Sequence, residues 1–574
     1  MDIRKDLNLI FEFKPLRFKV FTFLPIENLR PLLLVSKQFS AYAKEYFKEG
    51  KNLKVKQRDF ALMTTGKKFR PFCSLFSHIQ YLELSCRKLE LTFVSCLPKQ
   101  LISLKLTNLK PRHISNAQFY LDLTSRVPFL ETLKLHFRSK YSEDCYYSIG
   151  EEVLESISTM FLSLKKLKTF EFDTSCFSKF VKLYVQGLYA VILRAGQNLI
   201  SVKLSNFAFI NQIEFAGLVL EQLRELAIHN ESEELSDTNW LISQNFLSHI
   251  AIHFPNLTSL RLYEQSSYSN IVINQNTIVD LAKAYPGLET LELYYRGSSV
   301  TIPHVGLMTC FNMLPALREL TLASCKTLDA ASIRELVEKN RFLRKINFDY
   351  SLCDDYALGS ILEFYWKRNV LKDLSLKACG KITEDGFRYF FASMEGLEKL
   401  NISKNYHVTG EVLQIIVLTS PNLKSLAVSH CENAGNGVLC MILTSLKLLQ
   451  KFTFSHMSES NCSTITSDCF QALEGMTFGR LTTLSFSYLE YIDDSTIEDL
   501  VRVFPSVEKL KLGGCKKLTK QSIKILEKSQ ISKRLKVLGM QTIPKVAFKD
   551  KKEIEYYFQN FKKLVSLEVD IRYG

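Results

Sequence analysis

The sequence predicts an α/β solenoid in which short parallel strands line one face and helices cover the other. Three observations predict this fold: an apolar pattern that recurs along most of the 574 residues, a helix-like stretch after each copy, and prolines that separate the units. The pattern is Leu-x-x-Leu-x-Leu, with Ile, Val, Phe or Met replacing Leu in some copies. The first apolar positions of eighteen copies run from 79 to 564, so 485 residues over 17 intervals give a mean period near 28.5.

Six copies keep leucine at all three positions, and the other twelve substitute another apolar residue. Regular copies of this kind indicate that one structural unit stacks many times. The six leucine-only copies are Leu101-Leu104-Leu106, Leu130-Leu133-Leu135, Leu257-Leu260-Leu262, Leu288-Leu291-Leu293, Leu317-Leu320-Leu322 and Leu371-Leu374-Leu376.

Each unit is expected to contain a strand followed by a helix. The last three positions alternate apolar, variable and apolar, which places two side chains on one face of a short strand. Asp329 can cap free N–H groups at a helix start, and apolar residues follow it at helical spacing. Comparable capping residues in other units are Thr383, Thr409 and Thr519.

Proline marks the junction between several units. It cannot continue a helix and favours extended backbone at the preceding residue, so it ends one element where the next strand begins. Six such dipeptides fall two residues before the next strand's first apolar position: Val127-Pro128, Phe254-Pro255, Tyr285-Pro286, Leu314-Pro315, Ser420-Pro421 and Phe504-Pro505.

Stacking of these units predicts a curved array. A single unit buries too little apolar surface to offset the entropy of ordering its backbone, so neighbouring units must stabilise one another. Helices are wider than the strand spacing of about 4.8 Å. We therefore expect the strands on the concave side and the helices on the convex side.

A cysteine follows the strand at the same place in four units, and Asn405 takes this place in another. This Cys-x-x-Leu/Ile-Thr/Asp signature resembles the cysteine-containing subclass of leucine-rich repeats. The resemblance implies a right-handed leucine-rich-repeat solenoid, a horseshoe of about 18 repeats over residues 79–574. We interpret the cysteines as turn-packing residues whose S–H groups meet backbone carbonyls, rather than as metal or redox sites. They are Cys325, Cys379, Cys431 and Cys515.

Composition narrows the function classes. The fourteen cysteines include no Cys-x-x-Cys pair and no zinc-type cluster with histidine. The first residues are charged rather than signal-like, and no apolar run approaches the roughly 18 residues that span a membrane. No nucleophile with a base, phosphate loop or metal-binding spacing stands out. We therefore expect a non-catalytic cytoplasmic or nuclear protein with no cofactor, no metal and no membrane contact, and the lack of a recognisable nucleic-acid motif argues against a nucleic-acid partner.

Residues 1–78 lack the repeat. The stretch from Phe21 to Phe39 predicts two apolar helices around a proline turn, and it resembles the F-box. The resemblance implies an F-box-like helical module over residues 1–50, followed by a linker or capping helix over 51–78. A simple cap on the first repeat is the alternative. The residues that the resemblance assigns to adaptor binding are Leu16, Phe21, Leu24, Pro25, Leu29, Val35, Lys37 and Phe39.

An F-box ahead of leucine-rich repeats is typical of substrate receptors of Skp–cullin–F-box (SCF) ubiquitin ligases. The resemblance implies docking on the Skp adaptor, and through it on a cullin, while the repeats bind an unknown protein substrate. The alternative is a leucine-rich-repeat scaffold that binds a partner without ubiquitin chemistry. A small anionic ligand on the basic part of the concave face also stays open.

The concave face should display the third, fifth and seventh places of each unit. An aromatic group beside small residues suits a bound partner segment, although ordinary solvent-exposed strand residues would give the same pattern. At the fifth place, Lys105, Lys134, Lys203 and Arg261 add positive charge. The seventh-place residues that we predict to contact the partner are His229, Tyr263, Tyr294, Ser403, Ser429, Ser455 and Ser487.

Three further segments depart from the average unit. Residues 509–552 hold fourteen Lys or Arg against Glu527 and Asp550, a net charge of +12. This run is either a docking patch for an acidic, phosphorylated or nucleic-acid partner or a solvated convex face. Long intervals between copies predict inserted loops near residues 138–149 and 230–239, where solenoids often carry specificity.

Overall fold

The protein was analysed as a computed structural model, which divides into two compact units, residues 1–268 and 269–574. Within the ranges that follow, positions 193, 273, 366–367, 474, 562–563 and 565 are excepted. The structure describes residues 54–56, 79–86, 91–109, 113, 116–138, 151–176, 191–205, 219–230, 244–265, 271–296, 300–430, 435–455 and 465–569.

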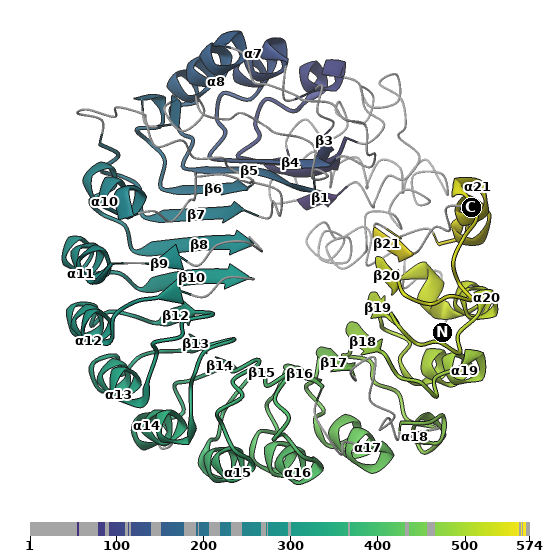
Figure 1. Cartoon of the computed structure of the whole chain (residues 1–574). Coiled ribbons are helices and arrows are strands. Elements are labelled where there is room, and N and C mark those ends of the chain that lie inside the picture. Colours follow the sequence, from purple (N-terminus) through teal and green to yellow (C-terminus); the bar gives the residue numbers. More distant parts are fainter. Residues whose placement is uncertain are drawn as a thin grey trace, which may run out of the picture. The chain divides into compact units, whose positions relative to one another are not determined.

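Parallel strands in chain order form the sheet of the first unit (Figure 1). Its helical elements are the 3-10 helix η2 (Leu91–Cys96) and helices α7 (Ala117–Arg126), α8 (Glu151–Ser163) and α10 (Gln244–His253). The strands are β1 (Lys54–Lys56), β2 (Tyr81–Ser85), β3 (Ser103–Leu109), β4 (Thr132–Arg138), β5 (Thr169–Cys176), β6 (Ser201–Ser205), β7 (Glu225–Asn230) and β8 (Ser259–Gln265).

Strand β1 corrects one expectation. Residues 51–78 were expected to form a linker or capping helix, but Lys54–Lys56 pair with β2 in parallel, with Val55 beside Leu82. The register explains this pairing, because Val55 takes the place of the buried Leu82 and Lys54 and Lys56 take the outward places on either side of it. The sheet thus starts one strand before the first full copy. The F-box-like segment lies outside the described residues.

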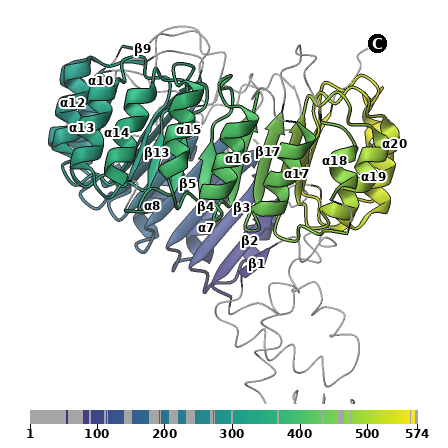
Figure 2. The same ribbon diagram turned by 90° about the horizontal axis from the view of Figure 1, so that it is seen from below.

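The second unit repeats the arrangement, with its strands on the inner side of a curve and its helices outside (Figure 1). From below, these helices stand side by side along the sheet (Figure 2). The strands are β10 (Thr290–Arg296), β12 (Glu319–Leu322), β13 (Lys345–Asn347), β14 (Asp373–Ser375), β15 (Lys399–Asn401), β16 (Ser425–Ser429), β17 (Lys451–Ser455), β18 (Thr483–Ser487), β19 (Lys509–Lys511), β20 (Val537–Met540) and β21 (Ser566–Val569).

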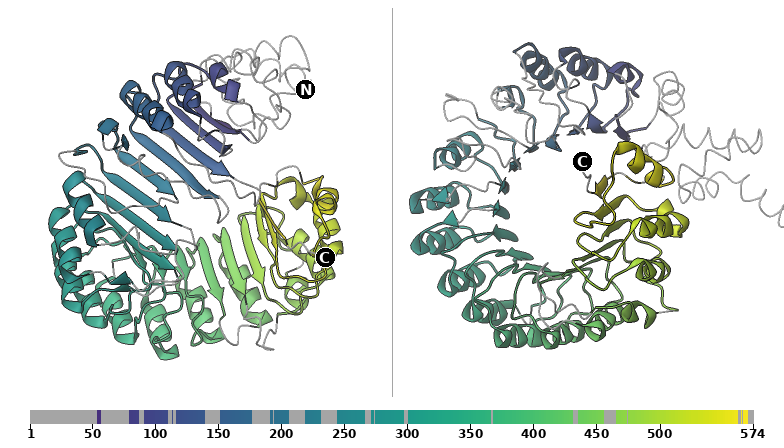
Figure 3. Two further views of the ribbon diagram at one scale, coloured as in Figure 1. Left: turned by 45° about the horizontal axis from the view of Figure 1, so that its top comes forward. Right: turned by 45° about the vertical axis from the view of Figure 1, so that its right-hand side comes forward.

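A helix separates most consecutive strands of the second unit, as Figure 3 shows from two further directions. Short strands β9 (Ile271–Val272) and β11 (Val300–Thr301) pair outside the main sheet. The helices are α11 (Gln275–Ala284), α12 (His304–Met313), α13 (Ala330–Lys339), α14 (Asp355–Tyr365), α15 (Glu384–Ser393), α16 (Gly410–Thr419), α17 (Asn436–Ser445), α18 (Asp468–Gln471), α19 (Asp494–Val503), α20 (Lys520–Lys528), η3 (Gln530–Lys533) and α21 (Lys551–Phe558).

The apolar positions of the repeat form the core. Each of the eighteen copies lies on its own strand, and rungs such as Leu104, Leu320 and Leu374 are fully buried. Burying one such side chain stabilises the fold by about 1.5–3 kcal/mol. In the final copy Leu567 and Val569 are only half-buried, because no described strand covers them. The predicted α/β leucine-rich-repeat solenoid is confirmed for each unit.

Helix starts and ends follow the sequence signals. The N–H of Ser332 donates to the side chain of Asp329, which caps α13, and Thr383, Thr409 and Thr519 cap their helices in the same way. Helices end at the residue before proline, as at Val127 in α7. These capping predictions are confirmed.

A carboxylate in one helix also supports the cap of the next. Asp355 accepts hydrogen bonds from the backbone N–H and hydroxyl of Thr383, at 2.8 and 2.7 Å. A side chain at Gly386 would lie 1.9 Å from the Asp355 Oδ1, so only glycine fits there. Asp494 holds Thr519 in the same way. Neighbouring repeats are therefore linked at their helix starts as well as through their strands.

The chain turns sharply after each strand. The eighth place has a positive φ in many repeats, for example 62° at Lys404 and 57° at His430. The N–H of Lys404 donates to the carbonyl of Ser429 in the next repeat at 2.6 Å, so hydrogen bonding between neighbouring repeats continues past the end of the strand. Among the described residues, no helix is both long and apolar enough to cross a bilayer.

The cysteine interpretation is confirmed at two described positions. The Cys379 thiol donates to the Phe348 carbonyl at 3.2 Å, and the Cys515 thiol donates to the Phe486 carbonyl at 3.6 Å. Asn405 makes the corresponding bond to the Leu376 carbonyl at 2.8 Å. Burial raises the pKa of the Cys379 thiol to about 12, so it stays protonated and donates. Cys431 lies outside the described residues.

Candidate partner-binding face

In each unit, the helices that the structure describes all lie on one face of the sheet, and none of them lies on the other face (Figure 1). This second face carries the third, fifth and seventh places of the repeat, since the fourth and sixth places point into the core. It is the surface on which partner contacts were predicted. The residues predicted to bind the Skp adaptor (Leu16, Phe21, Leu24, Pro25, Leu29, Val35, Lys37 and Phe39) lie outside the described residues.

In the first unit the fifth-place residues form one row across β2 to β6. Strand register places Glu83, Lys105, Lys134, Glu171 and Lys203 side by side in this order. Lys105 lies 3.6 Å from Glu83. The two remaining lysines contact opposite oxygens of Glu171, at 2.8 Å and 3.2 Å. Much of the positive charge predicted for this row is therefore neutralised within it.

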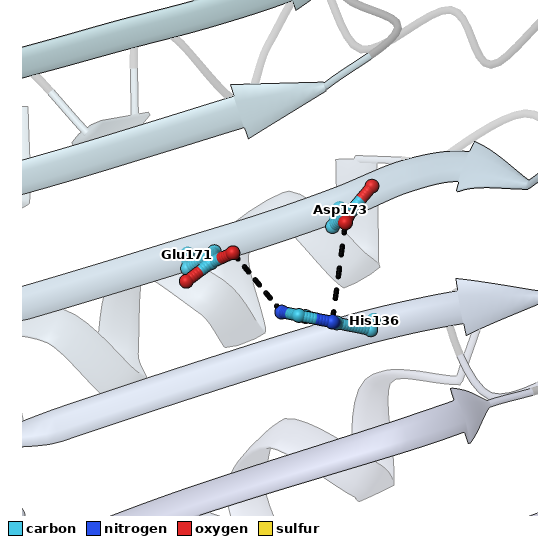
Figure 4. A group of neighbouring side chains, drawn as sticks. All are labelled: His136, Glu171 and Asp173. Carbon is cyan, nitrogen blue, oxygen red and sulfur yellow. Dashed lines mark ion pairs between the residues drawn. The ribbon is translucent and has the colours of Figure 1, made fainter. Parts of the chain in front are cut away.

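Glu171 is the centre of a charged network that also includes His136 and Asp173 (Figure 4). The His136 ring lies between the two carboxylates, with Nε2 3.1 Å from Glu171 and Nδ1 3.9 Å from Asp173. Burial alone would raise the pKa of Glu171, but the contacts with His136 and Lys134 and the charges of both lysines outweigh it. The pKa of Glu171 therefore lies well below its ordinary value. We call Lys134, His136, Glu171, Asp173 and Lys203 the paired face.

The paired face brings together a histidine and two carboxylates, a set that metal ions use as ligands. One atom from each of His136, Glu171 and Asp173 lies within 4.8 Å of the others. However, the two ring nitrogens face different carboxylates, and both Glu171 oxygens contact a lysine ammonium group. A cation would have to displace two like charges. The contacts favour an ion-pair network over a metal centre.

Sequence reasoning missed this group. His136 and Asp173 are 37 positions apart, and only the register of β4 against β5 makes them neighbours. The available signal was their shared seventh place in consecutive copies, with Glu171 at the fifth place of the second copy.

The predicted aromatic cluster is divided between the units. His229 and Tyr263 are register partners on β7 and β8, and their ring centroids lie 4.2 Å apart with a 38° tilt. Both are half-buried, which leaves part of each ring accessible to a partner. Tyr294 belongs to β10 of the second unit and is also half-buried.

In the second unit, strands β10 to β15 also pair their charges. Glu292 is buried and contacts Lys345, and Lys399 lies 2.9 Å from Asp373. Burial raises the pKa of Asp349, although hydrogen bonds from Ser375 Oγ at 2.5 Å and the Lys377 N–H at 2.9 Å act in the opposite direction. The acidic side chains of this part of the face that are named here therefore have partners within the protein.

The predicted serine floor needs correction. Ser403, Ser429 and Ser455 are only 5, 8 and 9% exposed, so they do not form an open contact surface. Ser429 lies between Ser403 and Ser455 of the neighbouring strands, so these small side chains are covered from either side. The Ser429 N–H donates to the Ser403 hydroxyl at 3.2 Å, so this hydroxyl supports the sheet. Ser487 is half-buried and still reaches the surface.

Strands β16 to β19 present a different surface. At their third and fifth places stand Lys451, Lys509 and Lys511, all exposed, and hydroxyl residues lie between them. The third, fifth and seventh places of these strands contain no Asp or Glu. We call this surface, formed by the third, fifth and seventh places of β16 to β19, the lysine face.

The basic run of residues 509–552 is thus not one patch. Lys509 and Lys511 lie on the lysine face, opposite the buried Leu510. Lys520 pairs with Glu553 at 2.5 Å, and Lys517 lies over the Tyr491 ring at 4.6 Å from its centroid. The segments predicted as inserted loops, 139–149 and 231–239, lie outside the described residues.

Comparison with known proteins gives a partial match. No family model matches the sequence. A stretch of 178 residues is 31% identical to the Antagonist of mitotic exit network protein 1 of Saccharomyces cerevisiae, and it covers 31% of this chain and 31% of that protein. The protein of the same name from Candida glabrata is 30% identical over 157 residues, which is 27% of this chain and 30% of the relative. The match spans less than a third of each curated relative.

Three solved structures share low similarity with the chain. The crystal structure of the Rad7 and Elc1 complex in yeast has a TM-score of 0.33 at 16% identity, with 88% of this chain and 94% of that chain covered. The TLR13–ssRNA13 complex gives 0.35 at 15%, covering 86% and 78%. An internalin from Listeria monocytogenes gives 0.31 at 14%, covering 59% and 87%. At these TM-scores the likeness carries no argument, so the fold assignment depends on the repeat and its strands.

Proposed function

We propose that this protein is the substrate-recognition subunit of an SCF-type ubiquitin ligase, in which the sheet faces opposite the described helices bind the protein to be ubiquitinated. The observation that carries the proposal is the polar face itself. In each unit, the described helices cover one side of the sheet (Figure 1). Charged and aromatic side chains lie on the other side. Such a surface suits recognition of a protein segment.

The amino-terminal sequence supports the ubiquitin part of the proposal. Its F-box-like pattern around Phe23-Leu24-Pro25 would dock on the Skp adaptor, and the repeats would hold the target near the ubiquitin-loaded enzyme. Tethering raises the effective concentration of the target's lysines beside the transfer machinery. In this mechanism the chain contributes binding and positioning, while the transfer is catalysed by its partners.

Affinity capture from cells tests this proposal. The wild-type chain should retain the Skp adaptor, a cullin and a target protein. A Leu24→Asp, Leu29→Asp double variant should lose adaptor and cullin together and keep the target, because a charge in an apolar helix face blocks docking. The matched control is Tyr356→Asp, Leu418→Asp, at positions that are 81 and 79% exposed on outer helices. Wild-type chain that captures no adaptor would reject the ubiquitin function.

The second candidate is a scaffold that inhibits a signalling pathway by binding one of its components without ubiquitin chemistry. The similarity to the Antagonist of mitotic exit network protein 1 favours it, since that name describes antagonism and names no ligase. This candidate expects that deletion of residues 1–50 leaves the captured partners unchanged. It is rejected if the deletion removes adaptor and cullin and the target then accumulates.

A further inference from the structure

We infer that Cys440 and Cys469 form an oxidative modification site, at which hydrogen peroxide converts the two thiols to a reversible disulfide that joins neighbouring repeats. Both side chains are free thiols and come from consecutive helices, α17 and α18. The inference goes beyond the proposed function, because it concerns the helical side of the solenoid and needs neither a target protein nor an adaptor.

The two sulfur atoms are in close contact. The Sγ atoms of Cys440 and Cys469 lie 3.1 Å apart, although the two residues are separated by 29 positions in the chain. Nonbonded carbon atoms that pack against one another lie about 3.5–4.0 Å apart, and sulfur is the larger atom. Because the S–S distance of a disulfide is about 2.05 Å, an approach of about 1 Å separates this contact from the bond.

Hydrogen bonds hold the contact in place a few residues ahead of each cysteine. Asn436 Nδ2 donates to Thr466 Oγ1 at 2.7 Å, and the Thr466 N–H donates to Asn436 Oδ1 at 2.9 Å. The Cys440 thiol also donates to the Cys469 carbonyl at 3.3 Å. The two repeats are therefore joined by polar contacts around the sulfur atoms, and holding two groups together in this way favours a reaction between them.

The two thiols also differ from the cysteines of the repeat signature. The Cys379 thiol is fully buried and donates to the Phe348 carbonyl. Cys440, by contrast, is only half-buried, so a small oxidant can reach its sulfur, whereas Cys469 is buried beside it. An accessible thiol next to a second thiol is the arrangement that redox-sensing proteins use, because the second thiol captures the oxidised form of the first.

The reaction takes two steps. The Cys440 thiolate attacks one oxygen of hydrogen peroxide, the O–O bond breaks, and the products are a sulfenic acid on Cys440 and one water. The Cys469 sulfur then attacks the sulfenic sulfur, so that the S–S bond forms and the S–O bond breaks. The proton of the Cys469 thiol leaves with the hydroxide as a second water. Two electrons pass from the two sulfur atoms to the peroxide, which is the only oxidant needed.

The order of the steps follows from the environments of the two thiols. Burial raises the pKa of the Cys469 thiol, and the neighbouring Cys440 thiol acts in the same direction. Since the thiolate is the nucleophile, Cys440 reacts first with the peroxide and Cys469 acts second. A dithiol such as dithiothreitol reverses the modification by thiol–disulfide exchange, in which the dithiol is oxidised and both cysteines return to thiols.

The test treats the full-length protein with a small excess of hydrogen peroxide, alkylates the remaining thiols and digests the chain without reductant. We expect a linked pair of tryptic peptides, residues 425–447 and 452–480, whose mass is two hydrogens below the sum of the two. Because the bond closes a loop in the unfolded chain, oxidation should also raise the melting temperature by about 3–6 °C. Dithiothreitol should remove both the linkage and the rise.

A second protease locates the bond, because each tryptic peptide contains one further cysteine. These are Cys431 and Cys462, both outside the described residues. Glu432 and Asp468 lie between the two cysteines of their peptides, so cleavage at acidic residues separates the four cysteines. The linked fragments should be those that contain Cys440 and Cys469.

Matched variants test the assignment. Cys440→Ser and Cys469→Ser should each lose the linked peptides and the rise in melting temperature. The control Cys431→Ser, Cys462→Ser removes one cysteine from each of the same two peptides and should form as much disulfide as the wild type. In Cys469→Ser, dimedone should trap severalfold more sulfenic acid on Cys440 than in the wild type, because the second thiol is missing. Circular dichroism of the reduced variants checks that they are folded.

Four results would overturn the inference. They are a linkage through Cys431 or Cys462, oxidation of Cys440 to a sulfinic acid without a disulfide, a disulfide between two chains on a non-reducing gel, and linkage of Cys440 to Cys469 without a rise in melting temperature. None of these results bears on adaptor capture, which requires the amino-terminal segment.

Discussion

The paired face and the lysine face are built on the same scaffold but use their outward positions differently. Both lie on parallel strands whose fourth and sixth places are buried apolar rungs. On the paired face, Glu171 contacts two lysines and a histidine of neighbouring strands. On the lysine face, Lys451 and Lys509 meet no acid among the described residues. The buried apolar residues at the fourth and sixth places therefore determine the fold. The outward residues between them determine whether a face pairs its own charges or leaves them accessible to a partner.

The largest expected effect is common to both faces and tests the shared scaffold. Leu133→Ala behind the paired face and Leu484→Ala behind the lysine face should each lower the free energy of unfolding by about 2–5 kcal/mol, because both leucines are fully buried. Thermal unfolding followed by circular dichroism measures the change. If only one variant were destabilised, the two faces would not share one kind of core.

The next effect should separate the faces. Glu171→Gln removes the charge that holds Lys134, His136 and Lys203, and we expect a loss of about 1–3 kcal/mol. Lys509→Gln, on the lysine face, should cost less than about 0.5 kcal/mol because an exposed lysine without a partner contributes little. Chemical denaturation measures both. Equal costs would show that the lysine face is as tightly paired as the other.

Acidification should change the contributions of Glu171 and Asp349 to the free energy of unfolding in opposite directions. The folded-state pKa of Glu171 is depressed, so its stabilising contribution is present above its ordinary value of 4.5 and is lost as pH falls toward the folded-state pKa. The pKa of Asp349 is raised above 3.8, so folding is favoured as pH falls through its folded-state pKa.

Melting temperatures between about pH 7 and pH 3 check this contrast. Relative to the wild type, Glu171→Gln should lose stability at neutral pH and approach the wild type below pH 4.5. Asp349→Asn should fall further behind the wild type as pH decreases. Parallel curves for all three proteins would contradict the assignment of these shifts to the two carboxylates.

The sequence predicted the scaffold well because its signals are local. Rungs such as Leu320, caps such as Thr409 and the proline after Val127 depend on neighbours a few positions away, and the structure confirms them. The paired face depends on register between strands more than thirty residues apart, which no local pattern specifies. The open character of Lys451 could not be predicted either, because pairing depends on which acids neighbouring strands supply.

The serines at the seventh place show that strand alternation alone does not predict the exposure of a side chain. Substitution of these serines gives the smallest predicted effect. Ser403 was predicted to face a partner, but it is 5% exposed and its hydroxyl accepts the Ser429 N–H. Ser403→Ala should therefore cost about 0.5–1.5 kcal/mol in stability and leave target capture unchanged. Ser487→Ala, at a half-buried place on the lysine face, should leave stability within about 0.5 kcal/mol of the wild type. Chemical denaturation and affinity capture measure both variants. If Ser403→Ala left stability unchanged and weakened target capture, while Ser487→Ala lowered stability, Ser403 would belong to the contact surface.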